Sequence, residues 1–114
     1  MSIEVTPHEL AEAVGLYGPT AYVLTGGADG RPRVTHSTVV VAGGRVRATL
    51  GRTASADAAA RPAVSVLWPA NADQSMSLIA DGVAHLEGEP GPDTVVEIEV
   101  TSAVRHRAAP PLGA

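Results

Sequence analysis

The sequence predicts a single, mainly β domain in which about six antiparallel strands form a closed or partly closed barrel, with short helices. Three observations lead to this prediction. The 114 residues fit one hydrophobic core and leave no room for two. Short β-prone runs alternate with Gly- and Pro-rich turns along most of the chain. Most neighbouring runs are not separated by the crossover helix that a parallel pair of strands requires.

The N-terminal segment is the first predicted element. Its Thr-Pro-His-Glu sequence matches a capping box with Pro at the first helical position, so a short helix should begin there. We expect residues 1–18 to form a helix that packs on the barrel. Its spacing buries Leu10 and Val14 and leaves Glu9 and Glu12 exposed.

The strands follow in order, and each is bounded by turn residues. Alternating or β-branched runs predict strands at residues 21–25, 33–42, 45–50, 63–68, 75–86 and 94–104. The Ala-rich residues 54–61 predict a short helix that ends at Pro62. Asp81-Gly82 predicts a bulge or bend within its strand. We expect the barrel domain to span residues 1–107 and the Pro-containing tail, residues 108–114, to be disordered.

The composition favours assembly of two copies. Apolar residues make up 45% of the chain, but the aromatic residues are one Trp, two Tyr and no Phe. Val, Ala, Leu and Ile must therefore fill the core, and they bury less apolar area than aromatic side chains do. Burial against a second subunit would add stability, so we expect a homodimer.

Charge and residue content exclude several classes of function. The formal net charge is −4 and the sequence has no basic run, which argues against nucleic acids and acidic membranes as partners. The absence of Cys excludes disulfides, thiolate metal sites and a Cys nucleophile. No signal-peptide pattern and no apolar run of about 20 residues is present. We expect a cytoplasmic protein.

The titratable residues form no recognisable catalytic or metal-binding pattern. The four His residues lie in different predicted elements without the spacing of a helical metal site, so we predict no metal. Glu97 and Glu99 alternate with apolar residues and should share one solvated sheet face. No spacing connects a Ser, a His and an Asp into a catalytic triad.

Several segments, in this order, resemble the pyridoxamine phosphate oxidase-like, or flavin reductase-like, split barrels. A strand ending in Thr precedes a D-G-x-P turn, a short helix precedes a P-x-V-S segment, and an x-G-x-A-x-L strand comes later. The matching segments are residues 21–25, 29–35, 49–53, 61–66 and 81–86. The resemblance covers most of residues 20–105. It implies a six-stranded antiparallel split barrel that forms a homodimer.

The resemblance also implies a cofactor, either flavin mononucleotide (FMN) or the deazaflavin coenzyme F-420, in clefts between the two subunits. Its phosphate would meet the turn after the third strand and the helix that follows. In this sequence the corresponding residues are Thr49, Gly51, Arg52, Thr53 and Ser55. A cation, hydroxyls and a helix N-terminus suit a phosphate. Alternatively, Thr53 or Ser55 caps the helix and Arg52 is solvated.

Two further residues are cofactor-binding candidates. His36 lies on a strand that runs beside the flavin ring in the similar proteins, although a half-exposed strand His is the more common situation. Trp68 would cover the cofactor from the partner subunit, or it anchors the core or the interface.

The sequence departs from the family pattern at two places. Relatives commonly place a Lys near the start of the helix, where this chain has Ala54 or Ser55, and all eight basic residues here are Arg. Arg52 would compensate, since a guanidinium binds phosphate with two prongs. Residues 89–93 form a short turn where many relatives carry a helical insertion.

Two functions remain open from the sequence. The leading hypothesis is a flavin- or deazaflavin-dependent oxidoreductase, in which the cofactor carries out the hydride transfer and the protein supplies binding and orientation. The alternative is a cofactor-free dimeric split barrel that serves as a scaffold or as a small-ligand binding module. The missing Lys favours the alternative, and the retained Arg and hydroxyl residues favour the oxidoreductase.

Overall fold

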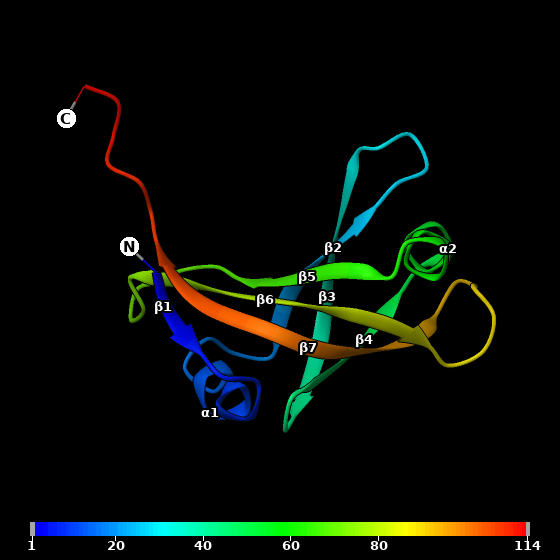
Figure 1. The fold of residues 1–114 in the computed structure, drawn as a ribbon, viewed down its shortest axis with the longest axis horizontal. Helices are drawn as coiled ribbons and strands as arrows, with labels where there is room; N and C mark the ends of the chain where they lie inside the picture. Colours follow the sequence, from blue (N-terminus) through cyan, green and yellow to red (C-terminus); the bar gives the residue numbers. More distant parts are fainter. Residues whose placement is uncertain (1, 114) are drawn as a thin grey trace.

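The computed structural model describes residues 2–113 and has a six-stranded antiparallel barrel with one additional strand (Figure 1). The strand order is β1-β7-β4-β3-β2-β5-β6, and pairing of β6 with β7 closes the barrel. The predicted mainly β fold is confirmed. The strands are β1 (Ser2–Val5), β2 (Thr20–Gly26), β3 (Pro32–Ala42), β4 (Arg45–Leu50), β5 (Ala63–Trp68), β6 (Met76–Leu86) and β7 (Thr94–Arg107).

The N-terminal segment differs from the prediction. Residues 1–18 are not one helix, because Ser2–Val5 form strand β1, which pairs with β7. Strand β7 is 14 residues long, and β4 pairs only with its first part. The later part therefore has free backbone hydrogen-bonding groups, which β1 satisfies. The local sequence pattern that predicted a helix cannot show that the distant strand β7 needs a partner strand.

A short helical segment follows β1. A 3-10 turn spans Pro7–Glu9 and continues as α1 (Leu10–Val14). Glu9 Oε1 accepts hydrogen bonds from the backbone N–H and the hydroxyl of Thr6, as the capping box predicts. These hydrogen bonds lower the pKa of Glu9. Leu10 is fully buried and Val14 is half-buried, while Glu9 and Glu12 are exposed.

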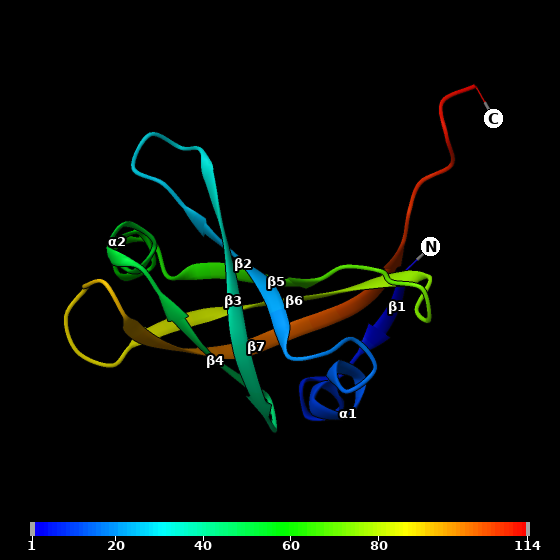
Figure 2. The ribbon, with the colours of Figure 1, turned by 180° about the vertical axis from the view of Figure 1, so that it is seen from behind.

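The core lies inside the barrel and consists of inward-facing aliphatic residues around one large aromatic side chain. Trp68 is the largest fully buried side chain. Its fully buried aliphatic neighbours in the core cluster include Val23, Val46, Leu50, Val66, Leu78, Val96 and Ile98. Helix α2 (Arg52–Ala60) closes one end of the barrel, near the β2–β3 hairpin (Figures 1 and 2).

The predicted irregularity in β6 is confirmed as a shift in register. Asp81 pairs with Ser102, whereas Gly82 pairs with Val100, so β7 carries an extra residue there. A Cβ atom on Gly82 would overlap the backbone carbonyl oxygen of Glu99. The close approach of β6 and β7 at this bulge therefore requires a glycine.

The outer surface of the barrel has a charged side over β4, β6 and β7. Arg45 lies 2.7 Å from Glu97, and Arg47 lies 2.8 Å from Glu87. Glu97 has a lowered pKa because it accepts a hydrogen bond from Arg45. The predicted solvated face around Glu97 is therefore a set of surface ion pairs.

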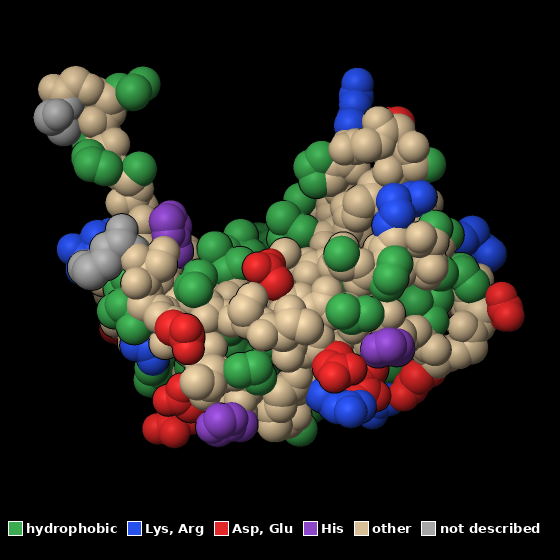
Figure 3. Space-filling view, viewed as in Figure 1, with side chains coloured by type: hydrophobic (Ala, Val, Ile, Leu, Met, Phe, Trp, Pro, Cys, Tyr) green, Lys and Arg blue, Asp and Glu red, His purple; other side chains and the backbone are tan. Residues whose placement is uncertain are grey.

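A second, more apolar side spans β3, β2, β5 and β6. Opposite residues in an antiparallel pair lie on one face, so the register defines two rows across these strands. One row is Val34–Leu24–Ser65–Asp81, and the other is His36–Tyr22–Leu67–Ile79. We call these eight residues the saddle. Figure 3 shows that the surface is hollowed and largely apolar between the β2–β3 hairpin and the C-terminal segment.

The C-terminal segment leaves the barrel after β7. Residues 108–113 contain neither helix nor strand and are exposed. The prediction that this tail is disordered remains a prediction, and residue 114 lies outside the described residues. Within residues 2–113, no helix has the length and apolar character that crossing a membrane requires.

Candidate functional site

The candidate site is the N-terminus of α2, which follows β4 directly. Gly51 is the N-cap residue, and no side chain caps the helix. The first helical hydrogen bond runs from the Ser55 N–H to the Gly51 carbonyl oxygen at 2.9 Å. The backbone N–H groups of Arg52, Thr53 and Ala54 therefore have no acceptor within α2. Neither Thr53 nor Ser55 acts as the cap that the alternative interpretation required.

The side chains around this end of α2 are accessible. Thr49, Gly51, Arg52 and Thr53 are all exposed. The Arg52 guanidinium takes part in none of the ion pairs or hydrogen bonds found among residues 2–113, although the Arg52 carbonyl oxygen accepts a hydrogen bond from Ser55. An unpaired guanidinium, a hydroxyl and free N–H groups thus meet at the positive end of the helix dipole. This arrangement suits a phosphate or another anion.

Ser55 lies behind this surface and not on it. Its side chain is fully buried, and its hydroxyl donates to the Arg52 carbonyl oxygen at 3.1 Å. The Ser55 Oγ in turn accepts a hydrogen bond from the backbone N–H of Gly91 at 3.3 Å. Ser55 therefore attaches the short turn between β6 and β7 to the first turn of α2. Sequence reasoning placed this hydroxyl among the phosphate donors, but its hydrogen is already used inside the protein.

A buried carboxylate fixes the other side of α2. Asp57 has a side chain only 9% exposed, and its Oδ2 accepts from Arg33 Nε at 2.7 Å. Its Oδ1 lies 3.3 Å from a terminal nitrogen of Arg61. Arg61 Nε donates to the Gly26 carbonyl oxygen at 2.7 Å. This network ties the β2–β3 hairpin to the helix and engages the two basic residues next to it.

His36 lies on the outer face of β3, as predicted for a strand residue. Its ring stacks on Tyr22 of β2, with centroids 4.7 Å apart and an interplanar angle of 21°. The neighbouring Ser37 hydroxyl donates to the Thr49 carbonyl oxygen at 3.1 Å, so this part of β3 lies beside the end of β4. The stacked pair is a flat, partly exposed surface close to the strand that leads into α2. Sequence reasoning did not identify Tyr22.

Trp68 lies in the core and is 0% exposed. Of the two alternatives given for Trp68, the structure therefore favours an anchor in the core. A fully buried indole has no surface that a cofactor bound by the partner subunit could touch. Its Nε1 is also buried without a hydrogen-bond partner among the described residues. The structure thus brings Thr49, Gly51, Arg52 and Thr53 together, and it separates Trp68 from them.

This chain is similar to known proteins in structure and not in sequence. No protein-family model matches the chain, and no curated protein sequence matches it. Solved structures match along most of the chain. A Clostridium acetobutylicum protein related to general stress protein 26, of the pyridoxinephosphate oxidase family, has a TM-score of 0.71 at 10% identity. The match covers 90% of this chain and 91% of that one.

Two further structures are named for the molecules they use. An F420 reductase has a TM-score of 0.65 at 17% identity, and the match covers 77% of this chain and 91% of that one. A FAD-binding protein from Mesorhizobium loti has a TM-score of 0.68 at 14% identity. This match covers 92% of this chain and 96% of that one. At these identities the comparisons establish the fold, and the chain has the split-barrel fold of the pyridoxamine phosphate oxidase-like proteins.

Proposed function

We propose that this protein is a homodimeric, flavin- or deazaflavin-dependent oxidoreductase that binds its cofactor phosphate at the N-terminus of α2. The proposal rests on three features that occur together at the N-terminus of α2. Arg52 is unpaired within the described chain, Thr53 is exposed, and no side chain caps the helix. Structural neighbours named as an F420 reductase and a FAD-binding protein support a cofactor of this class.

The donor set fits the phosphate of FMN or of coenzyme F-420. Arg52 would supply a charge-assisted hydrogen bond, and Thr53 would supply its hydroxyl. The free N–H groups of the first helical turn would bind the remaining oxygens. Ser55 supports this surface from below through its bonds to Arg52 and Gly91. Arg52, at this helix end, would compensate for the absence of Lys.

The remaining basic residues near α2 are less suitable. Arg33 and Arg61 are bound to Asp57, and Arg61 also donates to Gly26. Moving either guanidinium to a phosphate would leave the buried Asp57 carboxylate with fewer partners, which costs free energy. Arg47 is paired with Glu87 on the charged side of the barrel.

The ring of the cofactor would lie near the outer face of β3, where His36 and Tyr22 stack. An aromatic surface favours contact with another flat ring. The bound cofactor would supply hydride transfer, while the protein would bind it, orient it and hydrogen-bond its polar edge. His36 is the described residue on this surface with a ring nitrogen to offer to that edge.

The saddle supports the proposed homodimer. Val34 is 58% exposed, and Leu24, Leu67 and Ile79 are half-buried on the same side. The opposite side, over β4, β6 and β7, carries the ion pairs of Arg45 and Arg47. Exposed contiguous apolar surface indicates an interaction site, and a second copy would cover the same residues on both subunits.

Replacing Arg52 with Ala should weaken binding of FMN or coenzyme F-420 by about tenfold to a hundredfold. This factor corresponds to the loss of one hydrogen bond from a charged donor, about 1.5–3 kcal/mol. Folding should change little, because the side chain has no partner that the structure describes. Fluorescence titration of wild type and Arg52→Ala with each cofactor measures the difference.

Arg31→Ala is the matched control. Arg31 lies in the β2–β3 hairpin, is 87% exposed and has only a 3.8 Å contact with Asp29. Its removal changes the net charge equally but should leave cofactor affinity unchanged. Equal losses in the two variants would show a general charge effect and would contradict the site. Failure of wild type to bind either cofactor would favour the alternative, a cofactor-free scaffold or small-ligand binding module.

A further inference from the structure

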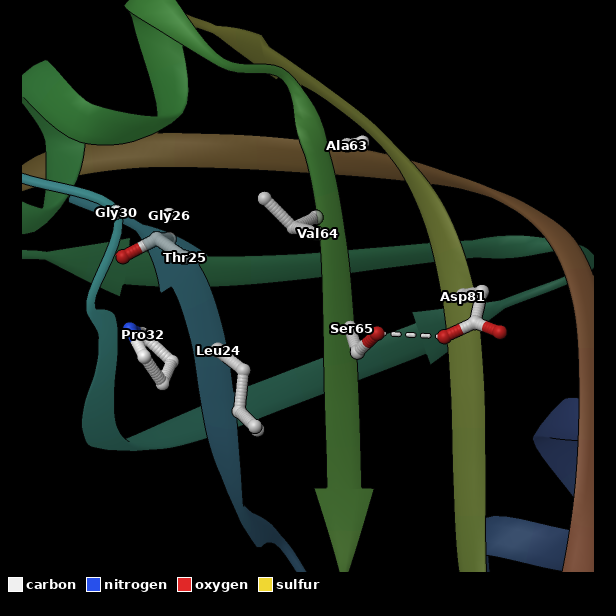
Figure 4. Close-up of a pocket in the computed structure, with 9 residues that line it drawn as sticks. All are labelled: Leu24, Thr25, Gly26, Gly30, Pro32, Ala63, Val64, Ser65 and Asp81. Atoms are coloured by element: carbon white, nitrogen blue, oxygen red, sulfur yellow. Dashed lines mark hydrogen bonds between the residues drawn. The ribbon is translucent and has the colours of Figure 1, made fainter. Parts of the chain in front are cut away.

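Two grooves of about 360 Å³ each lie on different sides of the barrel. The first opens between β2 and β5, and Figure 4 shows Leu24, Ser65 and Asp81 of the saddle among its residues, so the proposed homodimer would cover it. The second lies between β1 and α1, and no residue of the saddle lines it. In Figure 1, α1 lies below the barrel, whereas the β2–β3 hairpin that borders the saddle projects above it. The second groove, which we call the α1 groove, would therefore stay accessible in the dimer.

An arginine on the core-facing side of β7 lines the α1 groove. Arg105 pairs with Leu78 on β6 and with Ile3 on β1. Leu78 in turn pairs with Trp68, and both of these side chains are fully buried. Directly paired residues share one face of a sheet, so Arg105 continues an inward-facing row from the core to the groove. A charged side chain at such a position is unusual for a purely structural residue.

The Arg105 guanidinium has no partner in the part of the chain that the structure describes. Its Nε is buried without a hydrogen-bond acceptor. It also forms no ion pair within residues 2–113, although Glu4, Glu9 and Glu12 line the same groove. A buried N–H group without an acceptor costs free energy, and a bound molecule with a carboxylate would remove that cost.

The other wall of the α1 groove comes from the helical segment. Its lining residues, three or four positions apart on one side of the segment, are Glu9, Glu12, Ala13 and Leu16. One carboxylate oxygen of Glu9 is used in the capping box, whereas Glu12 is exposed and forms no ion pair among the described residues. Leu16 is 50% exposed, and Ile3 of β1 is 48% exposed. The groove thus combines a free guanidinium, free carboxylate oxygens and apolar surface.

We propose that the α1 groove binds a free α-amino acid with an aliphatic side chain. Its carboxylate would bind the Arg105 guanidinium, and its ammonium group would lie at Glu12 and the free oxygen of Glu9. Its side chain would pack against Ile3 and Leu16. A simple carboxylic acid would meet three carboxylates in the groove, and a simple amine would leave Arg105 without an acceptor. A molecule that carries both charges next to each other matches both walls, and the volume is in the range of small-molecule sites.

The test compares L-leucine with two analogues that each lack one charged group, on the full-length chain. The amine 3-methylbutylamine lacks the carboxylate, and 4-methylpentanoate lacks the ammonium group. In two-dimensional NMR titrations, leucine should shift the backbone amide signals of Ile3, Ala13 and Leu16. It should bind at least about tenfold more tightly than either analogue, the factor expected for the loss of one hydrogen bond between charged groups. The Nε–H signal of Arg105, identified by its absence in Arg105→Met, should move with leucine and 4-methylpentanoate and stay in place with the amine.

Two variants remove the two charged walls separately. Arg105→Met keeps a long apolar side chain and removes the guanidinium, so leucine should then bind no more tightly than 3-methylbutylamine. Glu12→Gln changes an exposed residue and should reduce the preference for leucine over 4-methylpentanoate. Arg107→Met and Glu89→Gln remove the same charges at exposed positions outside the groove, and they should leave all three affinities unchanged.

Arg52→Ala should also leave leucine binding unchanged, because α1 and α2 lie apart in both Figure 1 and Figure 2. This result would separate the α1 groove from the proposed cofactor site. The proposal would be overturned if leucine shifted no signal, if its shifts lay outside the groove, or if the three probes bound equally. A preference over the amine that persists in Arg105→Met, or a preference over 4-methylpentanoate that is unchanged in Glu12→Gln, would also overturn it.

Discussion

Replacing Trp68 with Ala should lower the free energy of unfolding by about 3–5 kcal/mol. Trp68 is the largest fully buried side chain, and its neighbours in the core are aliphatic. Val, Ala and Leu side chains are too short to fill the space of an indole, so the cavity would persist. A loss of this size is a large part of the stability of a small domain.

Urea denaturation of the wild type and two variants measures this effect. Trp68→Phe retains an aromatic ring and removes the Nε1–H group, which has no partner within residues 2–113. Its cost should be clearly smaller than that of Trp68→Ala. Because Trp68 is the single Trp, far-UV circular dichroism is the suitable signal for all three proteins. A loss below about 1 kcal/mol for the Ala variant would contradict the buried position.

Gly82→Ala should destabilise the barrel by about 3 kcal/mol, although it adds only one methyl group. The new Cβ would overlap the carbonyl oxygen of Glu99 and lie 2.8 Å from Ile98 Cγ2. The overlap is with backbone, so side-chain rotation cannot relieve it. Strands β6 and β7 would have to separate at the bulge, and this pair closes the barrel.

Gly91→Ala provides the comparison, because its Cβ would meet nothing closer than Thr94 Oγ1 at 3.7 Å. Its melting temperature should stay close to that of the wild type, while Gly82→Ala should melt well below it. Equal melting temperatures would show that β6 and β7 are not in close contact at Gly82.

Short-range patterns were sufficient to predict most strands. The alternation at residues 45–50 and the β-branched run at residues 63–68 gave both strands with their observed bounds. Asp81-Gly82 identified the bulge because glycine within a strand signals a close approach. Strand β1 could not be found in this way. It exists because β7 extends beyond β4, and that difference in length appears only when the sheet is assembled.

The site could be predicted in part. Arg52 was predicted to bind phosphate from the resemblance to the split barrels and from the lack of Lys, and the structure places it exposed at the start of α2. The Asp57 network was missed because Arg33 lies 24 residues away in the chain. An Asp within an Ala-rich helix, four residues before Arg61, was the available signal. Ser55 was predicted from its residue type, but whether a hydroxyl faces solvent or a neighbouring turn depends on the packed structure.

Sedimentation velocity in the presence of FMN, and separately of coenzyme F-420, tests the central claim most directly. Detection at the visible absorbance of the cofactor reports only molecules that carry it. We predict that at least one of the two cofactors will sediment with the wild-type protein as a species with the mass of two chains, and that Arg52→Ala will reduce this bound fraction. Absorbance that remains with free cofactor for both compounds, or that moves with a single chain, would contradict a cofactor-binding homodimer.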